Sequence, residues 1–178
     1  IYRKFNDYAN EARCYKVLGT IYEYFGDIGN AIDANGSAIA AAERIGDINM
    51  KTNAYNPLSG LYLNQNNIEK AMEIIEQSIA LKQQTGDTRG LAFAYYGRGK
   101  IYTATGQFDS AEEDFNKSIA IHTEMGEKLG LAMAYQKMGA LYMRRKDFFK
   151  AGKYLLQSLE LSDKYKMRMS KTKTSYML

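Results

Sequence analysis

The chain has 178 residues, of which 46% are hydrophobic, with a net charge of +4 and one cysteine. This composition is sufficient for one ordered body, and it excludes an internal disulfide framework. No apolar run is long enough to cross a membrane. The positive charge is concentrated in residues 141–178, which contain ten Lys and Arg against three Asp and Glu, so the charge of the whole chain does not indicate a nucleic-acid-binding surface.

Apolar residues recur with a helical period in eight successive stretches. Turn signals separate the stretches, because glycine closes a helix in the left-handed conformation and an acidic side chain can cap the next helix. These signals are Gly26-Asp27, Gly46-Asp47, Gly86-Asp87 and Gly126-Glu127. The sequence therefore predicts antiparallel helices joined by short turns, at residues 8–25, 28–45, 48–65, 68–85, 88–105, 108–125, 128–145 and 148–165.

The stretches form four copies of one unit of forty residues. Ala94, Tyr95, Gly99, Tyr102 and Ala111 recur as Ala134, Tyr135, Gly139, Tyr142 and Ala151, and earlier as Ala54, Tyr55, Ser59, Tyr62 and Ala71. Copies in one register predict a solenoid of helix pairs. We expect a single solenoid domain with repeats at 8–47, 48–87, 88–127 and 128–167. Residues 1–7 would end a preceding repeat of a longer protein, and 168–178 would form a partial fifth repeat or a cap helix.

The first copy carries Tyr15, Leu18, Gly19, Tyr22 and Ala31, an order that resembles the tetratricopeptide repeat over residues 8–165. The period resembles the long-helix type of kinesin light chains, Pins-like scaffolds and bacterial sensors or regulators. The resemblance implies an all-α fold, a right-handed α–α superhelix of four helix-hairpin repeats with a C-terminal partial or capping helix.

Several positions depart from the repeat pattern. Ser59 replaces the recurrent glycine, Arg98 replaces a leucine, and Asn35 stands where later copies have large apolar residues. Pro57 should kink its helix, and Cys14 shares a column with alanines, which predicts a small core residue. The recurrent glycine predicts a close approach of the two helices of each pair, since glycine inside a helix otherwise costs about 1 kcal/mol.

Nothing in the sequence predicts catalysis, a metal site or a cofactor. The single histidine, His122, excludes a two-histidine metal motif, and we expect it to be solvated. Residues 97–100, Gly-Arg-Gly-Lys, have a phosphate-loop composition but lie within a predicted helix. Glu112, Glu113 and Asp114 are expected to form a solvated charged face without a partner.

The resemblance implies that the first helix of each pair lines a concave groove. The columns on that face vary between copies whereas the core columns do not, as a binding template requires. Lys16 matches the family's clamp for a chaperone C-terminus, but Thr20, Pro57 and Gly60 do not, so that subtype is rejected. The predicted groove residues are Arg13, Lys16, Thr20, Glu23, Asn53, Asn56, Leu63, Phe93, Tyr96, Lys100, Thr103, Met133, Gln136, Met143 and Arg144.

These residues predict a protein-interaction scaffold that binds a peptide segment of a partner, with its cations favouring an acidic ligand. A peptide-sensing input domain of a bacterial signalling or transcriptional regulator is the alternative. Nucleic-acid contact through Arg144, Arg145, Lys146, Lys164, Lys166 and Arg168, and self-association through the ends of the array, are further hypotheses. The location is unknown; the cytoplasm is favoured, or the periplasm if a targeting segment has been removed.

Overall fold

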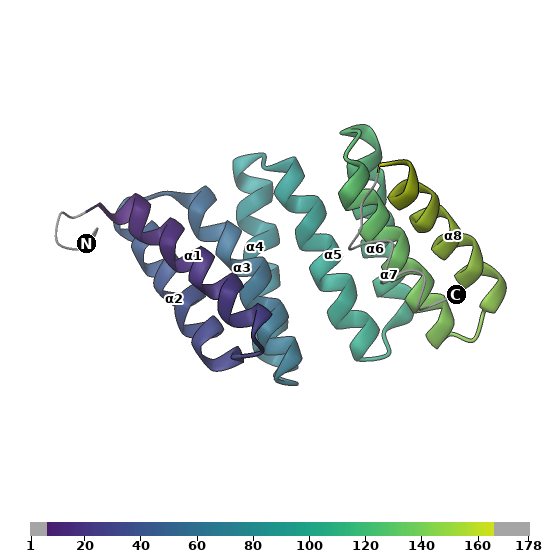
Figure 1. Ribbon diagram of the computed structural model, residues 1–178, viewed down its shortest axis with the longest axis horizontal. Helices are drawn as coiled ribbons and strands as arrows, with labels where there is room; N and C mark the ends of the chain where they lie inside the picture. The colour runs from purple at the N-terminus through teal and green to yellow at the C-terminus, as the bar shows by residue number, and fades with distance from the viewer. Residues whose placement is uncertain (1–6, 166–178) are drawn as a thin grey trace. The chain divides into compact units, whose positions relative to one another are not determined.

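The computed structural model describes residues 7–165, and every regular element within them is an α-helix. The chain divides at Asp87 into two compact units, which are described separately below (Figure 1). The predicted partial repeat or cap at 168–178 lies outside the described residues, as do residues 1–6.

The first unit contains four helices, each packed against the next, and α1 also touches α3. They are α1 (Tyr8–Tyr24), α2 (Ile28–Arg44), α3 (Ile48–Asn64) and α4 (Ile68–Thr85). The second unit repeats this arrangement, with α5 touching both α6 and α7. Its helices are α5 (Thr88–Ala104), α6 (Phe108–Glu124), α7 (Lys128–Arg144) and α8 (Phe148–Lys164).

The predicted turn chemistry explains where most of the helices begin and end, although Glu127 forms no side-chain hydrogen bond that caps α7. Asp27 caps α2 by accepting a hydrogen bond from the backbone N–H of Asn30, at 3.2 Å, and Asp7, Asp47, Asn67 and Asp147 cap their helices in the same way. Glycines with positive φ close the turns, for example Gly26 at 76°. These contacts satisfy backbone groups that a helix end would otherwise leave free, which is why the turns need so few residues.

The recurrent glycine allows the two helices of a pair to approach closely. A Cβ atom at Gly139 would lie 2.6 Å from the Cγ atom of Leu155, and one at Gly99 would lie 2.7 Å from the Phe115 ring. Both distances are too short for carbon atoms in contact. The glycine of α5 or α7 is therefore the space into which the large residue of α6 or α8 packs.

The two departures from this contact have local explanations. In the second pair the hydroxyl of Ser59 donates a hydrogen bond of 2.8 Å to the backbone carbonyl of Ala71, so the larger side chain is satisfied at the interface. In the first pair the Asn35 amide lies over Gly19 and donates to the carbonyl of Ala31, at 2.8 Å. A polar side chain at either position thus finds a backbone acceptor on the second helix.

Cys14 is exposed, so the prediction of a core residue is wrong. The equivalent residues Ala54 and Ala134 are buried, because α2 packs on α3 and α6 packs on α7. Among residues 7–165 no helix precedes α1 to cover the same face.

We expect Gly139→Ala to destabilise the protein by about 1–3 kcal/mol, because the added methyl group forces Leu155 and the neighbouring backbone to move. Gly36→Ala is the matched control. Gly36 also lies inside a helix but has no atom within 4 Å of an added Cβ, so alanine there should stabilise by about 0.5–1 kcal/mol. Urea denaturation followed by circular dichroism measures both; equal effects of the two substitutions would contradict the contact.

Candidate functional site

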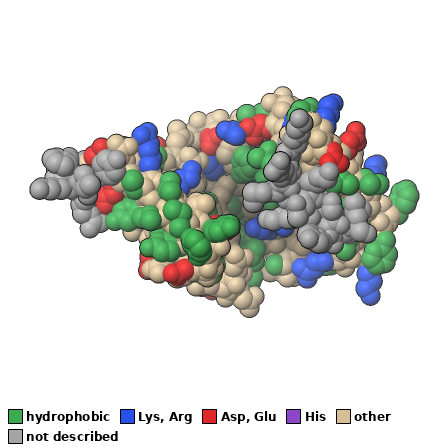
Figure 2. All heavy atoms as spheres, in the orientation of Figure 1, with side chains coloured by type: hydrophobic (Ala, Val, Ile, Leu, Met, Phe, Trp, Pro, Cys, Tyr) green, Lys and Arg blue, Asp and Glu red, His purple; other side chains and the backbone are tan. Residues whose placement is uncertain are grey.

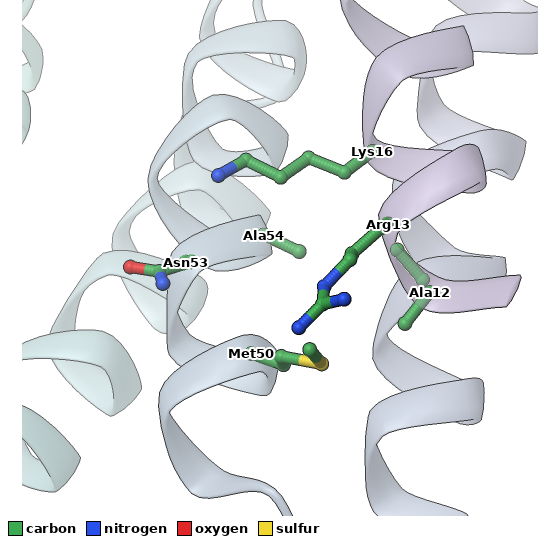
Figure 3. A pocket seen from close by; sticks show the side chains of 7 residues that line it. Ala12, Arg13, Lys16, Met50, Asn53 and Ala54 are labelled. Atoms are coloured by element: carbon green, nitrogen blue, oxygen red, sulfur yellow. The ribbon is translucent and has the colours of Figure 1, made fainter. Parts of the chain in front are cut away.

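A pocket of about 190 Å³ lies between α1 and α3 in the first unit. Arg13 and Lys16 extend from α1 towards the α3 residues Met50 and Asn53 (Figure 3). Its apolar lining comes from three buried alanines, Ala12, Ala38 and Ala54. The sequence-predicted residues Arg13, Lys16 and Asn53 are thus brought together around one concave site.

The pocket carries positive charge that no carboxylate neutralises within the described residues. Arg13 donates a hydrogen bond to the side chain of Asn10, at 3.2 Å, and neither Arg13 nor Lys16 forms an ion pair in residues 7–165. Both side chains are exposed. Because an exposed cation keeps most of its hydration, these two residues can attract an anionic group and align it without a large desolvation cost.

Asn53 offers the pocket acceptors and donors at once. Its amide side chain is exposed, and its backbone carbonyl lacks the usual helical donor four residues later, since Pro57 has no N–H. The helix nevertheless continues from Ile48 to Asn64. On the same face Asn56 accepts a hydrogen bond from Ser78, at 2.9 Å, which orients its amide group.

The remaining predicted residues of the first unit lie on the same stripe but outside the pocket lining. Thr20 is exposed and donates a hydrogen bond to the backbone carbonyl of Lys16, at 3.2 Å. Glu23 is exposed and Leu63 is half-buried. This part of the stripe therefore provides surface beside the pocket rather than a second concavity.

In the second unit the predicted aromatic residues are half-buried and packed on core side chains. The ring centroids of Phe93 and His122 lie 4.8 Å apart, and those of Tyr96 and Phe115 lie 6.3 Å apart. Burial raises the pKa of the Tyr96 hydroxyl to about 12. These two rings therefore pack against the core, and each presents only part of its surface.

Other predicted residues of the second unit are partly committed to the fold. Arg144 donates to the backbone carbonyl of Thr103, and the Lys100 ammonium lies 6.0 Å from the centre of the Tyr96 ring. Met133 is half-buried and Met143 is exposed. Gln136 is buried, with 7% of its surface exposed, so its expected place on an open groove surface is wrong.

The structure corrects the expectation for the carboxylates of α6. Asp114 is 2% exposed and accepts two hydrogen bonds from Arg98, at 2.7 and 2.9 Å. Glu112 accepts from the Tyr142 hydroxyl and from Arg145. Only Glu113 remains on the surface, where it pairs with Lys117. The arginine in the leucine column is therefore explained by an acidic partner sixteen residues later.

His122 is buried rather than solvated, with 1% of its surface exposed. It lies against Gly130, where even a methyl group would collide with the imidazole ring. Its whole column is buried: Ala42, Lys82, His122 and Ser162. Lys82 pairs with Asp87, at 3.1 Å, and the Nδ1 atom of His122 lies 3.5 Å from Glu127. The column turns inward because it follows the core positions Ser78, Ser118 and Ser158 by one helical turn.

Within residues 7–165, no group of three or more His, Cys, Asp and Glu side chains is placed to hold a metal ion, and no helix there is long and apolar enough to cross a membrane.

Residues 51–124 match the family model described as tetratricopeptide repeat. Over those residues the chain resembles a tetratricopeptide repeat. Solved structures of such proteins have the same fold at low sequence identity, and no curated protein sequence matches significantly.

Three solved structures illustrate the likeness. A Rap protein complexed with competence and sporulation factor has a TM-score of 0.85 at 16% identity, covering 94% of this chain and 47% of that protein. BtubC (BKLC) from P. vanneervenii has a TM-score of 0.72 at 18% identity, with 92% and 75% covered. A putative kinesin light chain of Podosopora anserina with TPR-like repeats has a TM-score of 0.70 at 18% identity, with 93% and 82% covered. The chain thus spans under half of the Rap protein.

Within the matched residues 51–124, we expect Arg98→Leu to destabilise the protein by about 3–5 kcal/mol, because it leaves the buried Asp114 carboxylate without its arginine partner. The double variant Arg98→Leu/Asp114→Ile reproduces the residues of the previous repeat, Leu58 and Ile74, which pack together in the core. It should recover most of the lost stability. Urea denaturation of the three proteins measures this; a double variant as unstable as the single one would contradict it.

We expect the stability of the protein to fall as the pH drops below about 6.5. Burial lowers the pKa of His122 from its ordinary value, and the nearby Arg89 also lowers it, whereas Glu127 acts in the opposite direction. The unfolded chain therefore binds a proton at a higher pH than the folded chain, so His122 stabilises the fold fully only above the unfolded pKa.

The measurement for this prediction is the difference in unfolding free energy between the wild type and His122→Gln across this pH range. The difference should shrink as the pH falls. A difference that is independent of pH would show that the imidazole does not titrate on unfolding.

Proposed function

We propose that the protein is an interaction scaffold that binds an acidic peptide segment of a partner protein on the exposed face of its first helices, α1 and α3, and the corresponding α5 and α7. The ligand would be extended or helical. The proposal needs no catalysis and no cofactor.

The observation that carries the proposal is the pocket between α1 and α3, where two cations without ion-pair partners in residues 7–165 flank an apolar floor. A carboxylate of the peptide would lie between Arg13 and Lys16, and an apolar side chain next to it would contact Met50 and the alanines. The Asn53 amide and its freed carbonyl would pair with the peptide backbone. The two cations would thus select an acidic residue of the peptide, and Asn53 would bind the peptide backbone next to it.

The corresponding face of the second unit adds a surface of different chemistry. Phe93 and Tyr96 are aromatic rings with partly exposed surfaces, and Met143 is 38% exposed. Aromatic side chains and methionine supply much of the contact area at protein interfaces. A ligand segment bound to this second face would therefore present apolar residues to it.

A sensory role is the second candidate, supported by the similarity to the Rap protein solved with competence and sporulation factor. In that case peptide binding would change the arrangement of the two units, and another domain would respond. Small-angle X-ray scattering with and without saturating peptide separates the two functions: a scaffold keeps its scattering curve, whereas a sensor changes it.

To test the binding site, fluorescein-labelled peptides rich in Asp and Glu, together with neutral and basic peptides of the same length, are titrated with the protein and followed by fluorescence polarisation. We expect the acidic peptides to bind. Arg13→Glu/Lys16→Glu should weaken that binding at least about tenfold, because two attractive contacts become repulsive.

Arg44→Glu/Lys70→Glu is the matched control, since it changes the net charge equally at two exposed cations that stack on Tyr8 and Tyr62 away from the pocket. It should retain binding. If both double variants lose peptide affinity equally, the effect is due to net charge alone. If neither loses affinity, the peptide does not bind at α1 and α3.

A further inference from the structure

The outward face of α1 exposes apolar side chains that the fold elsewhere buries. Leu18 is 40% and Ile21 is 45% exposed, and Figure 2 shows hydrophobic side chains gathered over α1. The equivalent residues of α7, Met138 and Leu141, are fully buried because α6 packs on α7. The repeat therefore identifies what fits on α1, namely a helix of the type of α2 or α6.

The first turn of α8 exposes apolar residues of its own. Phe148 is 70% and Phe149 is 85% exposed. In α6 the equivalent of Phe148 is Phe108, which is half-buried and lies under the guanidinium groups of Arg144 and Arg145 at the end of α7. The start of α8 is thus the part that would meet the end of a following first helix.

The contact between α6 and α7 shows which residues would meet. Asp109 at the start of α6 pairs with Arg145 at the end of α7. At the two surfaces that have no neighbouring helix within residues 7–165, the equivalents of this ion pair are Phe149 on α8 and Phe25 after α1. The salt bridge between α6 and α7 is therefore replaced by two exposed phenylalanines, one on each surface.

Phenylalanine occurs in the columns of Asp109 and Arg145 only at these two positions. The column of Asp109 contains Gly29, Glu69, Asp109 and Phe149, and the column of Arg145 contains Phe25, Gln65, Thr105 and Arg145. Large apolar residues occur in either column only where no neighbouring helix is described. Tyr24, beside Phe25, is 84% exposed, and it occupies the column of Arg144, which stacks on Phe108.

We propose that the start of α8 in one copy packs on the outward face of α1 in a second copy, with Phe148 and Phe149 against Tyr24 and Phe25. The contact would continue the repeat from one molecule into the next and bury Leu18 and Ile21. Because the two surfaces differ, the contact is head-to-tail and can grow into an open chain. It is independent of the peptide site proposed above, which lies on another face of α1.

Sedimentation velocity over micromolar to millimolar concentrations tests the proposal. We expect the average sedimentation coefficient to rise continuously with concentration, without stopping at a dimer. Cys14 provides a second readout, since it is exposed on the same face of α1. Its reaction with a maleimide should slow as the protein concentration rises and the neighbouring copy covers it.

Charge substitutions at the exposed phenylalanines distinguish this contact from other modes of association. Phe25→Asp/Phe149→Asp places two carboxylates opposite each other and should weaken association at least about tenfold. Phe25→Arg/Phe149→Asp reproduces the ion pair of Arg145 and Asp109 and should associate more tightly than the first variant. Leu129→Asp, at an exposed site on α7, is the control and should behave as the wild type.

Mixing single variants tests the direction of the contact. Phe25→Asp keeps an intact α8 surface and Phe149→Asp an intact α1 face, so each alone should be largely monomeric, whereas their mixture should form a one-to-one dimer. Association of Phe149→Asp alone through α1 would indicate a head-to-head contact and overturn the proposal. A wild-type protein that stays monomeric, with Cys14 equally reactive at every concentration, would also overturn it and indicate that a helix of another origin covers α1.

Discussion

One steric contact sets the geometry of each helix pair: a small residue of the first helix faces a larger residue of the second. In the last two pairs a glycine leaves room for Phe115 or Leu155, and the first two pairs solve the same problem with Asn35 or Ser59 bonded to a backbone carbonyl. Because the distance between the helices is fixed in this way, the turns can be short and the opposite face of the first helix is free to vary. The proposed peptide site is a consequence of that freedom.

Buried or partly buried polar groups form contacts within a helix pair and between successive pairs, at positions where a simple repeat would have apolar residues. Arg98 pairs with Asp114, Lys82 with Asp87, and Glu112 with Tyr142 and Arg145. Removing one partner of such a pair costs stability, whereas replacing both partners with apolar residues is often neutral. These pairs can therefore specify which helices pack together without adding much stability. The exposed phenylalanines fit the same interpretation. They occupy the columns that hold an ion pair between α6 and α7, at two surfaces that no helix of residues 7–165 covers.

The sequence predicted the fold well because its signals are local. Glycine and acidic residues define the turns, and the helical period and the recurrent glycine define the packing within a pair.

The prediction from sequence failed where a side chain has a partner on another helix or across a turn. Asp114 and His122 were placed on the surface, and the acidic and basic members of each pair lie sixteen or more residues apart or across a turn. Cys14 failed for the opposite reason, since its column is buried only where a preceding helix covers it. Of the predicted groove residues, Arg13, Lys16 and Asn53 line one pocket, whereas Gln136 is buried. The helical period predicts which residues share a face of a helix, but it does not predict which neighbouring helices cover that face.

The contact between small and large residues can be tested most directly with a double-mutant cycle in the third pair. Gly99→Ser and Phe115→Ile together reproduce the residues of the second pair, Ser59 and Ile75, where the serine hydroxyl reaches a backbone carbonyl. If the two positions share one space, each single variant is destabilised and the double variant loses less than the sum of the two losses. Unfolding free energies that add to within about 0.5 kcal/mol would show that the two sites are independent and would contradict the account.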